Sequence, residues 1–298
     1  MRPRALAWMA AVLLACGTST HCDVAQAQSI QDALKGLLRG TVPTVPSQTA
    51  PKTTEPAART LGTLLGTQST EEEISVGEGV AAKVLGAAPL WGRADVQRYV
   101  NLVGRTVASQ SERKDLPWAF GVIDTSAVNA FAAPGGLILV TRGLFEMLDS
   151  EDELAAILAH EIAHVNRQHH YNVIKQQKVV EVGADAATRG RGSEQVVSKL
   201  ANAGAEILAR GLDKSAEFEA DRDAMILAAR AGYDSSALVG VLGKMSERSG
   251  AEPAFQLLFK THPSPIDRLS ELAAVANDQV EAAAVRSPAA GRIGQIGR

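Results

Sequence analysis

The segment Ser150–Val165 reads SEDELAAILAHEIAHV, and the interpretation of this 298-residue chain starts from it. Ser150 is a favourable N-cap, and Glu153, three residues later, completes a capping box, so a helix is predicted to begin here. Apolar side chains then recur at the 3.6-residue spacing of a helix. They are Leu154, Ile157, Leu158, Ile162 and Val165. The segment is therefore predicted to be a helix with an apolar face in the core.

Two histidines lie one turn apart on this predicted helix. His160 and His164 share a helix face, so both imidazoles can approach one metal ion. Glu161 lies about 100° round the helix from His160, within reach of a water molecule beside that ion. The alternative, a pair of hydrogen-bonded core histidines, leaves Glu161 as a buried carboxylate without a role, which is unfavourable. The pattern therefore favours a metal site. His169 and His170 are expected at the surface.

A catalytic zinc site needs a third protein ligand, and cysteine is not available for it. The chain has two cysteines, Cys16 and Cys22, both near its N-terminus. A helix predicted to begin near residue 215 carries Glu217 and Asp221 four residues apart on one face. Glu217 would bind the metal, and Asp221 would accept the free N–H of a ligating histidine and fix its tautomer. A solvated acidic helix face is the alternative. Glu219 is not expected to be a ligand.

The remaining pattern predicts an α+β, mostly helical fold with a small three-stranded sheet. The predicted strands are Trp118–Asp124, Val128–Phe131 and Leu137–Thr141, with a turn at Pro134-Gly135-Gly136. Residues 167–182 are expected to continue the central helix. The other predicted helices are Glu71–Leu85, Ala94–Gln110, Gln195–Arg210, Ala216–Ala231, one from Ser235 or Ser236 to about Ser249, and one from the Ser264 N-cap and Pro265 to about Val275.

The N-terminal residues 1–27 have the form of a signal peptide. A basic start precedes an apolar run that is shorter than the about 20 residues needed to span a bilayer. Two cleavage sites compete. Ala25-Gln26-Ala27 suits ordinary signal peptidase, whereas Leu13-Leu14-Ala15-Cys16 resembles a lipobox, which would make residues 1–15 the signal and Cys16 a lipidated residue. A buried N-terminal helix is a third alternative. We expect an exported, periplasmic protein, lipid-anchored to the outer membrane if Cys16 is modified.

The rest of the chain divides by composition into three segments. Residues 28–70 are rich in Thr, Pro, Ser and Gln and are predicted to be a flexible tether. The globular domain is expected at residues 71–276, followed by a frayed tail at 277–298. The formal net charge of −3 argues against a nucleic-acid partner. No stretch after the leader is apolar for long enough to span a membrane.

The motifs in their order resemble a known family. HEIAH is preceded by EDELAAILA and followed by EFEADRDA at 217–224. NAFAAPGGLILVTRGL lies at Asn129–Leu144 and THPSPIDRL at Thr261–Leu269. Together they resemble zinc metalloendopeptidases of the HtpX and CAAX-prenyl-protease type, peptidase family M48, in the periplasmic or lipoprotein branch. The resemblance implies a gluzincin-type metallopeptidase domain, with the sheet packed on the active-site helices. We expect neither transmembrane helices nor an appended helical-repeat domain.

The resemblance also implies a site. His160, His164 and Glu217 match the family's zinc ligands, with one Zn²⁺ per subunit, and Glu161 matches its general base. Asp221 matches an aspartate to which a proton-donor role is sometimes assigned. His262 and Arg268 match the histidine and arginine of an HPSxxxR element near the catalytic centre. His262 could donate to a developing oxyanion or bind zinc as a fourth ligand, and the sequence leaves both open.

The hairpin from Asn129 to Val140 is the expected substrate-binding element. An exposed strand edge there could pair with an extended peptide through backbone hydrogen bonds. The substrate-binding residues would be Asn129, Ala130, Phe131, Gly135 and Gly136. The alternative is an ordinary hairpin in the core. Residues Gly183–Ser193 are a candidate lid or access loop, and the alternative is a simple connector between helices.

These observations predict a zinc metalloendopeptidase that cleaves unfolded or misassembled cell-envelope polypeptides. The alternative from another class is a chaperone-like or assembly factor whose zinc site is structural or self-inhibited. His262 as a permanent fourth ligand would give such a closed site, although a structural site has no use for Glu161. A zinc aminopeptidase is disfavoured because the chain has no GxMEN-type element to hold a substrate amine.

Overall fold

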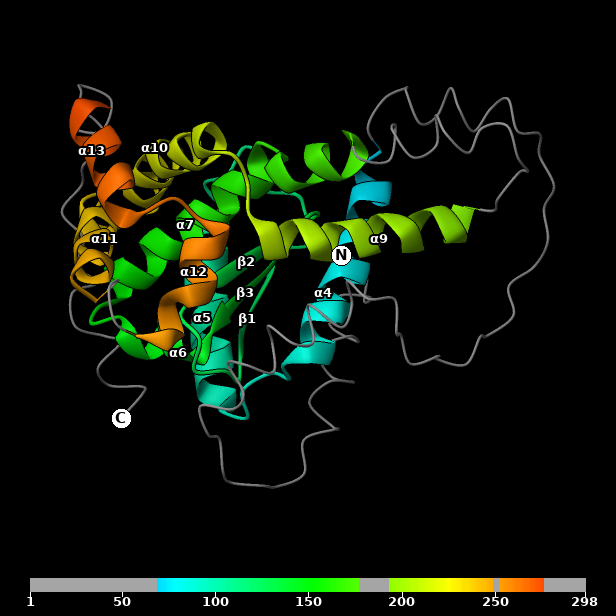
Figure 1. Cartoon of the computed structure of the whole chain (residues 1–298), viewed down its shortest axis with the longest axis horizontal. Helices are drawn as coiled ribbons and strands as arrows, with labels where there is room; N and C mark the ends of the chain where they lie inside the picture. Colours follow the sequence, from blue (N-terminus) through cyan, green and yellow to red (C-terminus); the bar gives the residue numbers. More distant parts are fainter. Residues whose placement is uncertain (1–68, 177–192, 249–251, 276–298) are drawn as a thin grey trace.

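The computed structural model describes residues 69–176, 193–248 and 252–275. In this part of the chain, helices pack on both faces of one three-stranded sheet (Figure 1). The prediction of an α+β, mostly helical fold with a small sheet is confirmed. The predicted signal peptide with Cys16, the tether, the loop at 183–192 and the C-terminal tail lie outside the described residues. Among the described helices, none combines the length and the apolar character that crossing a membrane requires.

Two helices precede the sheet, close to where the apolar periodicity predicts them. They are α4 (Thr70–Ala87) and α5 (Ala94–Ala108). The Ser69 hydroxyl accepts a hydrogen bond from the N–H of Glu72 and so caps the start of α4. Helix α5 buries a stripe of valines, which explains why its position could be read from the sequence.

The sheet has the strand order β1-β3-β2. Strand β1 (Ala119–Ile123) runs parallel to β3 (Leu137–Thr141), and β2 (Ala130–Ala133) runs antiparallel to β3. The predicted second strand, Val128–Phe131, was two residues too early. The N–H of Val128 donates instead to the carbonyl of Ala254, so Val128 lies outside the ladder.

Side chains that alternate along the strands divide the interior into two cores. Phe120, Ile138 and Val140 point to a core shared with α5, α7 and α10, whereas Phe131 and Leu139 point to a core shared with α4 and α9. The sheet therefore separates the α7 side of the molecule from the α4–α9 side (Figure 1).

The central helix begins and is capped nearly as predicted. Helix α6 (Arg142–Met147) leads into α7 (Glu151–Asn166), and the hydroxyl of Ser150 accepts from the N–H of Glu153. The reciprocal bond differs from the expected box, because the Glu153 carboxylate accepts from the N–H of Asp149 rather than from that of Ser150. The start of α7 is therefore fixed by two hydrogen bonds, one to the Ser150 hydroxyl and one to the Glu153 carboxylate.

Helix α7 ends earlier than expected. The prediction of a continuous helix through residues 167–182 was wrong at its start, because Gln168 has a φ of 55° and interrupts the helix. Residues 169–176 form a separate helical segment. The break redirects the chain immediately after the two histidines of α7.

The described C-terminal part of the chain, residues 193–248 and 252–275, contains four longer helices and two short ones. Helix α10 packs along α7, α9 packs across α4, and α11 and α13 pack together beside α10 (Figure 1). The short η1 and α12 were not predicted. The elements are α9 (Ser193–Arg210), α10 (Lys214–Arg230), α11 (Ala237–Arg248), η1 (Pro253–Phe255), α12 (Gln256–Thr261) and α13 (Pro265–Val275).

Candidate metal centre

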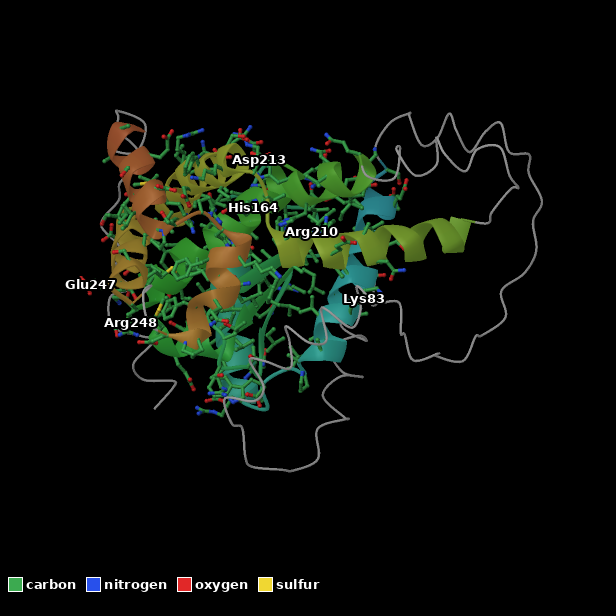
Figure 2. The ribbon with its side chains drawn as sticks, in the orientation of Figure 1. Lys83, His164, Arg210, Asp213, Glu247 and Arg248 are labelled. Carbon is green, nitrogen blue, oxygen red and sulfur yellow. The ribbon has the colours of Figure 1, made fainter. Side chains whose placement is uncertain are left out.

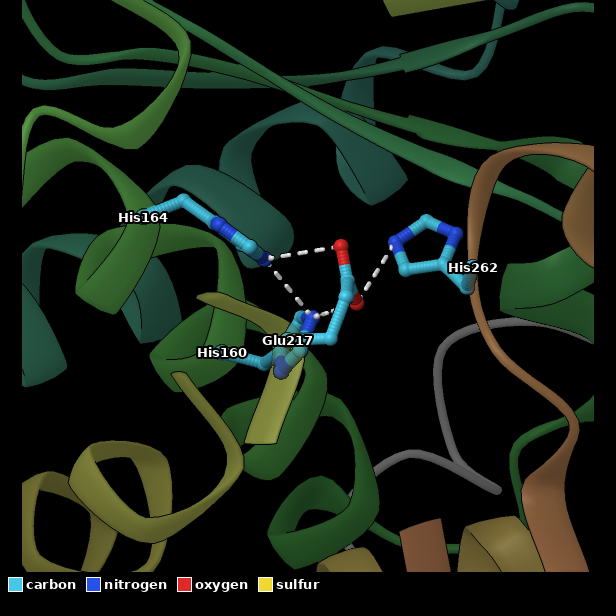
Figure 3. Close-up of side chains that lie close together, drawn as sticks. All are labelled: His160, His164, Glu217 and His262. Carbon is cyan, nitrogen blue, oxygen red and sulfur yellow. Dashed lines mark hydrogen bonds and ion pairs between the residues drawn. The ribbon is translucent and has the colours of Figure 1, made fainter. Parts of the chain in front are cut away.

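Four side chains from three parts of the chain converge beside the sheet. His160 and His164 come from α7, Glu217 from α10 and His262 from the residue after α12. One ligand atom of each lies within 4.8 Å of the others. Figure 3 shows the Glu217 carboxylate between the two imidazoles of α7 and the ring of His262. The structure thus brings together the three predicted metal ligands and His262.

Helix caps place the convergent side chains. The Asp213 carboxylate accepts from the N–H of Ala216 and fixes the start of α10, so Glu217 falls in its first turn and faces α7. Glu151 anchors the start of α7, because its carboxylate accepts from the hydroxyls of Tyr99 and Tyr233 at 2.9 and 3.2 Å. The N-terminal ends of α7 and α10 are therefore both held in place by hydrogen bonds.

The donor atoms suit a small divalent cation. The Nε2 atoms of His160 and His164 are 3.1 Å apart, and each lies 3.6 Å from an oxygen of Glu217. Two donors on one tetrahedral zinc at about 2.0–2.1 Å lie about 3.3–3.4 Å apart, close to these values. Glu217 is 1% exposed, and its Oε2 has no hydrogen-bond partner. A buried carboxylate oxygen without a partner beside two imidazole nitrogens fits a cation.

Asp221 contacts His160 at Nδ1, the ring nitrogen that does not face the cluster. Its Oδ1 lies 2.9 Å from Nδ1 of His160, so the ring N–H donates to the carboxylate, as the sequence predicts. The Arg268 guanidinium grips the same carboxylate with two N–H groups. Arg268 is 4% exposed and is not one of the clustered ligands. The structure places Arg268 against Asp221, and its catalytic role stays a prediction.

Electrostatics in the metal-free protein follow from burial and these contacts. Burial and the Arg268 charge lower the pKa of His160, but Asp221 and Glu217 outweigh them and raise this pKa to about 9. Burial and then the His160 charge hold the pKa of His164 well below its usual value. The pKa of Glu217 is lowered to about 2, because His262 and His160 more than offset its burial. Glu217 is therefore ionised and ready to bind a cation.

Glu161 is buried directly beside this cluster. It is 3% exposed, and burial raises its pKa to about 7, while the His160 charge opposes this shift. A general base works best when its pKa is near the working pH. The environment of Glu161 therefore suits a group that takes up and releases a proton.

His262 lies at the C-terminal end of α12. Its backbone N–H donates to the carbonyl of Leu258, and its Nδ1 lies 2.9 Å from the hydroxyl of Thr261. Its Nε2 lies 3.8 Å from Oε2 of Glu217, and burial lowers its pKa to about 4. A neutral imidazole with Nε2 facing the cluster is compatible with either role that the sequence leaves open.

The prediction that His169 and His170 lie at the surface was wrong. His169 has an 11% exposed side chain, and its Nδ1 lies 3.0 Å from Nδ1 of His164. The ring of His170 lies 5.3 Å from that of His164, and burial lowers its pKa to about 3. On a continuous helix, His164 and His169 would point about 140° apart, so helical spacing gives no signal for their contact. The turn at Gln168 produces it.

The predicted substrate strand lies at the edge of the sheet but is covered. Strand β2 pairs only with β3 among the described strands and packs against α7. Its side chains are all buried, including Ala130 and Phe131. Asn129 is 0% exposed, and neither atom of its side-chain amide has a hydrogen-bond partner. The exposed strand edge expected from the sequence is therefore not present in this conformation.

The turn glycines are held by packing. Gly135 and Gly136 have φ values of 78° and 101°, which favour glycine. A Cβ atom on Gly135 would lie 2.6 Å from Cα of Ile74, and one on Gly136 would lie 3.3 Å from the Trp118 ring. The N–H of Gly135 donates to the carboxylate of Glu73. Gly135 therefore allows α4 to approach the turn, and Gly136 allows the turn to approach Trp118.

Figure 2 shows His164 among the interior side chains, whereas Glu247 and Arg248 project from the outer end of α11. The cluster thus belongs to the inside of the molecule, where water is scarce and electrostatic interactions are strong. Glu219, in contrast, has a 39% exposed side chain on α10 and is not one of the clustered ligands, as predicted.

Comparison with known proteins matches residues 94–276 to peptidase family M48. The beta-barrel assembly-enhancing protease of Yersinia pestis is 30% identical over 224 residues, covering 71% of this chain and 45% of the relative. The mitochondrial metalloendopeptidase OMA1 of Schizosaccharomyces pombe is 31% identical over 175 residues, covering 58% and 51%. Metalloprotease YcaL of Escherichia coli (strain K12) is 28% identical over 158 residues, covering 52% and 61%. The chain spans about half the length of the first two relatives.

Proposed function

The chain belongs to peptidase family M48, and we propose that it is a zinc metalloendopeptidase that hydrolyses internal bonds of polypeptides. The domain is of the gluzincin type, with two histidines on one helix and a glutamate on the next. One observation carries the proposal: His160, His164 and Glu217 converge within 4.8 Å, and Glu161 is buried beside them.

The proposed division of roles follows the geometry. His160, His164 and Glu217 would hold the metal. When bound, zinc would supply a Lewis acid that polarises a peptide carbonyl and makes water acidic enough to lose a proton near neutral pH. Glu161 accepts that proton and passes it to the amine that leaves when the peptide bond breaks. Asp221, held by Arg268, keeps His160 in one tautomer.

The role of His262 distinguishes between two possible functions of the site. As a hydrogen-bond donor, its ring would stabilise the oxyanion that develops on the substrate carbonyl. As a permanent fourth ligand, it would close the site, and the protein would then be a chaperone-like or assembly factor. Its position within the cluster is compatible with both roles. His262→Ala should lower turnover in the first case and raise it in the second, measured as casein hydrolysis.

For the substrate we propose an unfolded or misassembled cell-envelope polypeptide. Ala130 and Phe131 would lie along the substrate backbone at the free edge of β2, once that edge is uncovered. The backbone of Asn129 is bonded to Thr141, so Asn129 would contribute its side-chain amide. The position of β2 beside α7 supports this proposal. The contribution of Gly135 and Gly136 would be to shape the hairpin. Bacterial relatives of this chain are named beta-barrel assembly-enhancing proteases, which is compatible with a substrate in the envelope.

The proposed location is the periplasm of a bacterium, with lipid attachment at Cys16 if the lipobox is used. Exported protein labelled with radioactive palmitate separates the two cleavage sites. Label that disappears in Cys16→Ser supports a lipoprotein. Absence of label in the unchanged protein would leave cleavage after Ala27 and a free periplasmic product.

The central test is the exchange of Glu161 for glutamine. Glu161→Gln should keep one zinc per subunit, because the ligands remain, but should lose casein hydrolysis, because the proton acceptor is gone. Metal analysis and a caseinase assay, with and without chelator, give both readings. Asp223→Asn on the surface of α10 is the control and should keep both zinc and turnover. Casein hydrolysis by Glu161→Gln at the normal rate would remove Glu161 from the mechanism.

A further inference from the structure

A row of hydrogen bonds leads outward from the metal ligand His164. Nδ1 of His164 lies 3.0 Å from Nδ1 of His169, and Nε2 of His169 lies 3.2 Å from Oε2 of Glu219. The side chain of His169 is 11% exposed and that of Glu219 is 39% exposed. The row therefore begins in the interior, passes through one half-buried ring and ends on α10 at the surface.

The protons of this row follow from metal binding at His164. Two ring nitrogens 3.0 Å apart require one donor and one acceptor. A neutral imidazole that offers Nε2 to a metal carries its proton on Nδ1, so His164 donates and His169 accepts. His169 then carries its own proton on Nε2 and donates it to Glu219, whose carboxylate can only accept. With Nε2 of His164 facing the metal, this is the one distribution of protons that gives each hydrogen bond in the row a donor and an acceptor.

Each of the two proposed histidine ligands thus donates its Nδ1 proton toward a carboxylate of α10, one directly and the other through a second ring. The N–H of His160 is received directly by Asp221, which is held by Arg268. The N–H of His164 reaches Glu219 through the ring of His169. Asp221 and Glu219 lie two residues apart on α10, so one helix fixes the orientation of both imidazoles of α7.

Arginine keeps the outer end of the row in place. Arg167, at the C-terminal end of α7, lies 3.5 Å from Oε1 of Glu219 and 2.7 Å from Oδ2 of Asp223. This pair holds the Glu219 carboxylate at the outer end of the row. The contact between His164 and His169 depends on the turn at Gln168, because side chains five residues apart on one helix face different directions.

We propose that His169 and Glu219 are positioning residues that hold His164 with Nε2 free for the metal. The inference rests on the proposed metal site of His160, His164 and Glu217. Outer hydrogen-bond partners of this kind typically change metal affinity by about 10- to 100-fold when they are removed. Neither residue needs to touch metal or substrate to have this effect.

The test measures the zinc dissociation constant of the full-length protein by competition with a chromophoric chelator. His169→Phe keeps the ring volume but accepts and donates nothing, so its dissociation constant should rise about 10- to 100-fold. His169→Asn places an amide oxygen where Nδ1 was, and it should recover most of the loss. Glu219→Ala should weaken zinc binding less than His169→Phe, because the contact between the rings remains.

The control variant is Asp223→Asn, which removes a charged partner of Arg167 between the same two helices but leaves His169, Glu219 and the Arg167–Glu219 pair in place. Its zinc dissociation constant should equal that of the unchanged protein. Urea unfolding of each metal-free variant separates an effect on the fold from an effect on the site. If His169→Phe does not fold, the partly exposed Glu219 still gives a reading, because Glu219→Ala should bind zinc more weakly than Asp223→Asn.

The outcomes distinguish this inference from the proposed function. Weaker binding in His169→Phe with recovery in His169→Asn would support the inference. Equal zinc affinity in the unchanged protein, His169→Phe and Glu219→Ala would overturn it and leave the proposed metal site intact. Equal weakening in His169→Phe and His169→Asn would also overturn it, because the hydrogen bond would then not matter. A complete lack of zinc binding by the unchanged protein would overturn the proposed function itself.

Discussion

Asp221 hydrogen-bonds to the candidate metal centre through His160 but is not one of the clustered residues. It receives the N–H of His160 on one side and two N–H groups of Arg268 on the other, and all three side chains are buried. The Arg268 charge and the hydrogen bonds more than offset burial, so the pKa of Asp221 lies well below its usual value. A fully ionised acceptor fixes the tautomer of His160 more firmly than a neutral one could.

This pairing predicts the effect of losing the guanidinium. Arg268→Met would leave Asp221 as a buried charge with one partner, and the free energy of unfolding of the metal-free protein should fall by about 3 kcal/mol or more. Urea denaturation measures the change. Arg222→Met is the matched control, because Arg222 pairs with Glu271 at 3.4 Å between the same helices, α10 and α13, in a partly exposed position.

The control variant should lose no more than about 1 kcal/mol, because ion pairs near the surface are screened by water. Similar losses in Arg268→Met and Arg222→Met would contradict the argument, since burial would then make no difference. Arg268→Lys should fall between them, because lysine keeps the charge but cannot grip the carboxylate with a planar fork.

At the scale of residues, spacing along two helices, read together with the HExxH motif, predicted most of the residues that cluster in the candidate site. His160, His164, Glu217 and Asp221 are pairs four residues apart on single helices, and such pairs share a face whatever the rest of the fold does. The place of His262 came only from the family resemblance. The contact of His169 could not be predicted, because it depends on a left-handed residue, Gln168, whose conformation the sequence does not announce.

At the scale of elements, α4 shows how closely a helix can approach the sheet. A Cβ atom on Gly77 would lie 1.7 Å from the carbonyl oxygen of Pro134, at the β2–β3 turn. The same helix contains Gly86, where an added Cβ meets nothing within 4 Å. The carboxylate of Glu73 also joins α4 to that turn, through the N–H of Gly135, and pairs with Arg113 at 2.7 Å.

Alanine at these two glycines should therefore have opposite effects on stability. Gly77→Ala would force α4 away from the turn and should lower the free energy of unfolding by about 2 kcal/mol or more, as overpacking does. Gly86→Ala should raise it by up to about 1 kcal/mol, because alanine loses less backbone entropy in a helix. Urea denaturation of the two variants makes the comparison, and a stable Gly77→Ala protein would show that α4 does not pack so closely.

Elements with a local signal were predicted better than elements defined by distant contacts. Helices α5 and α10 carry their own apolar stripes or caps, so their bounds were predicted to within about two residues, and the Ser150 cap located the start of α7 equally well. Strand β2 is displaced because Val128 bonds to Ala254, more than a hundred residues later. Helix α12 is a single short turn packed between larger elements, and no periodicity can develop over that length.

At the scale of the whole molecule, the candidate metal site joins segments that are distant in sequence. His160 and His164 lie on α7, Glu217 lies on α10, and His262 lies at the end of α12. In the metal-free protein these parts are brought together by the core around α7 and by the Arg268 pairing across α10 and α13. A ligand that binds this arrangement, and not the unfolded chain, must stabilise it.

Zinc should therefore raise the melting temperature of the full-length protein, and a chelator should reverse the change. At a free zinc concentration of about 100 times the dissociation constant, the gain is about 2.7 kcal/mol, or roughly 5–10 °C for a domain of this size. Calorimetry on three proteins tests the origin of the shift. The unchanged protein and Glu161→Gln should show it equally, because Glu161 is not a ligand, whereas Glu217→Ala should lose most of it. A shift that persists in Glu217→Ala would mean that zinc binds elsewhere on the chain.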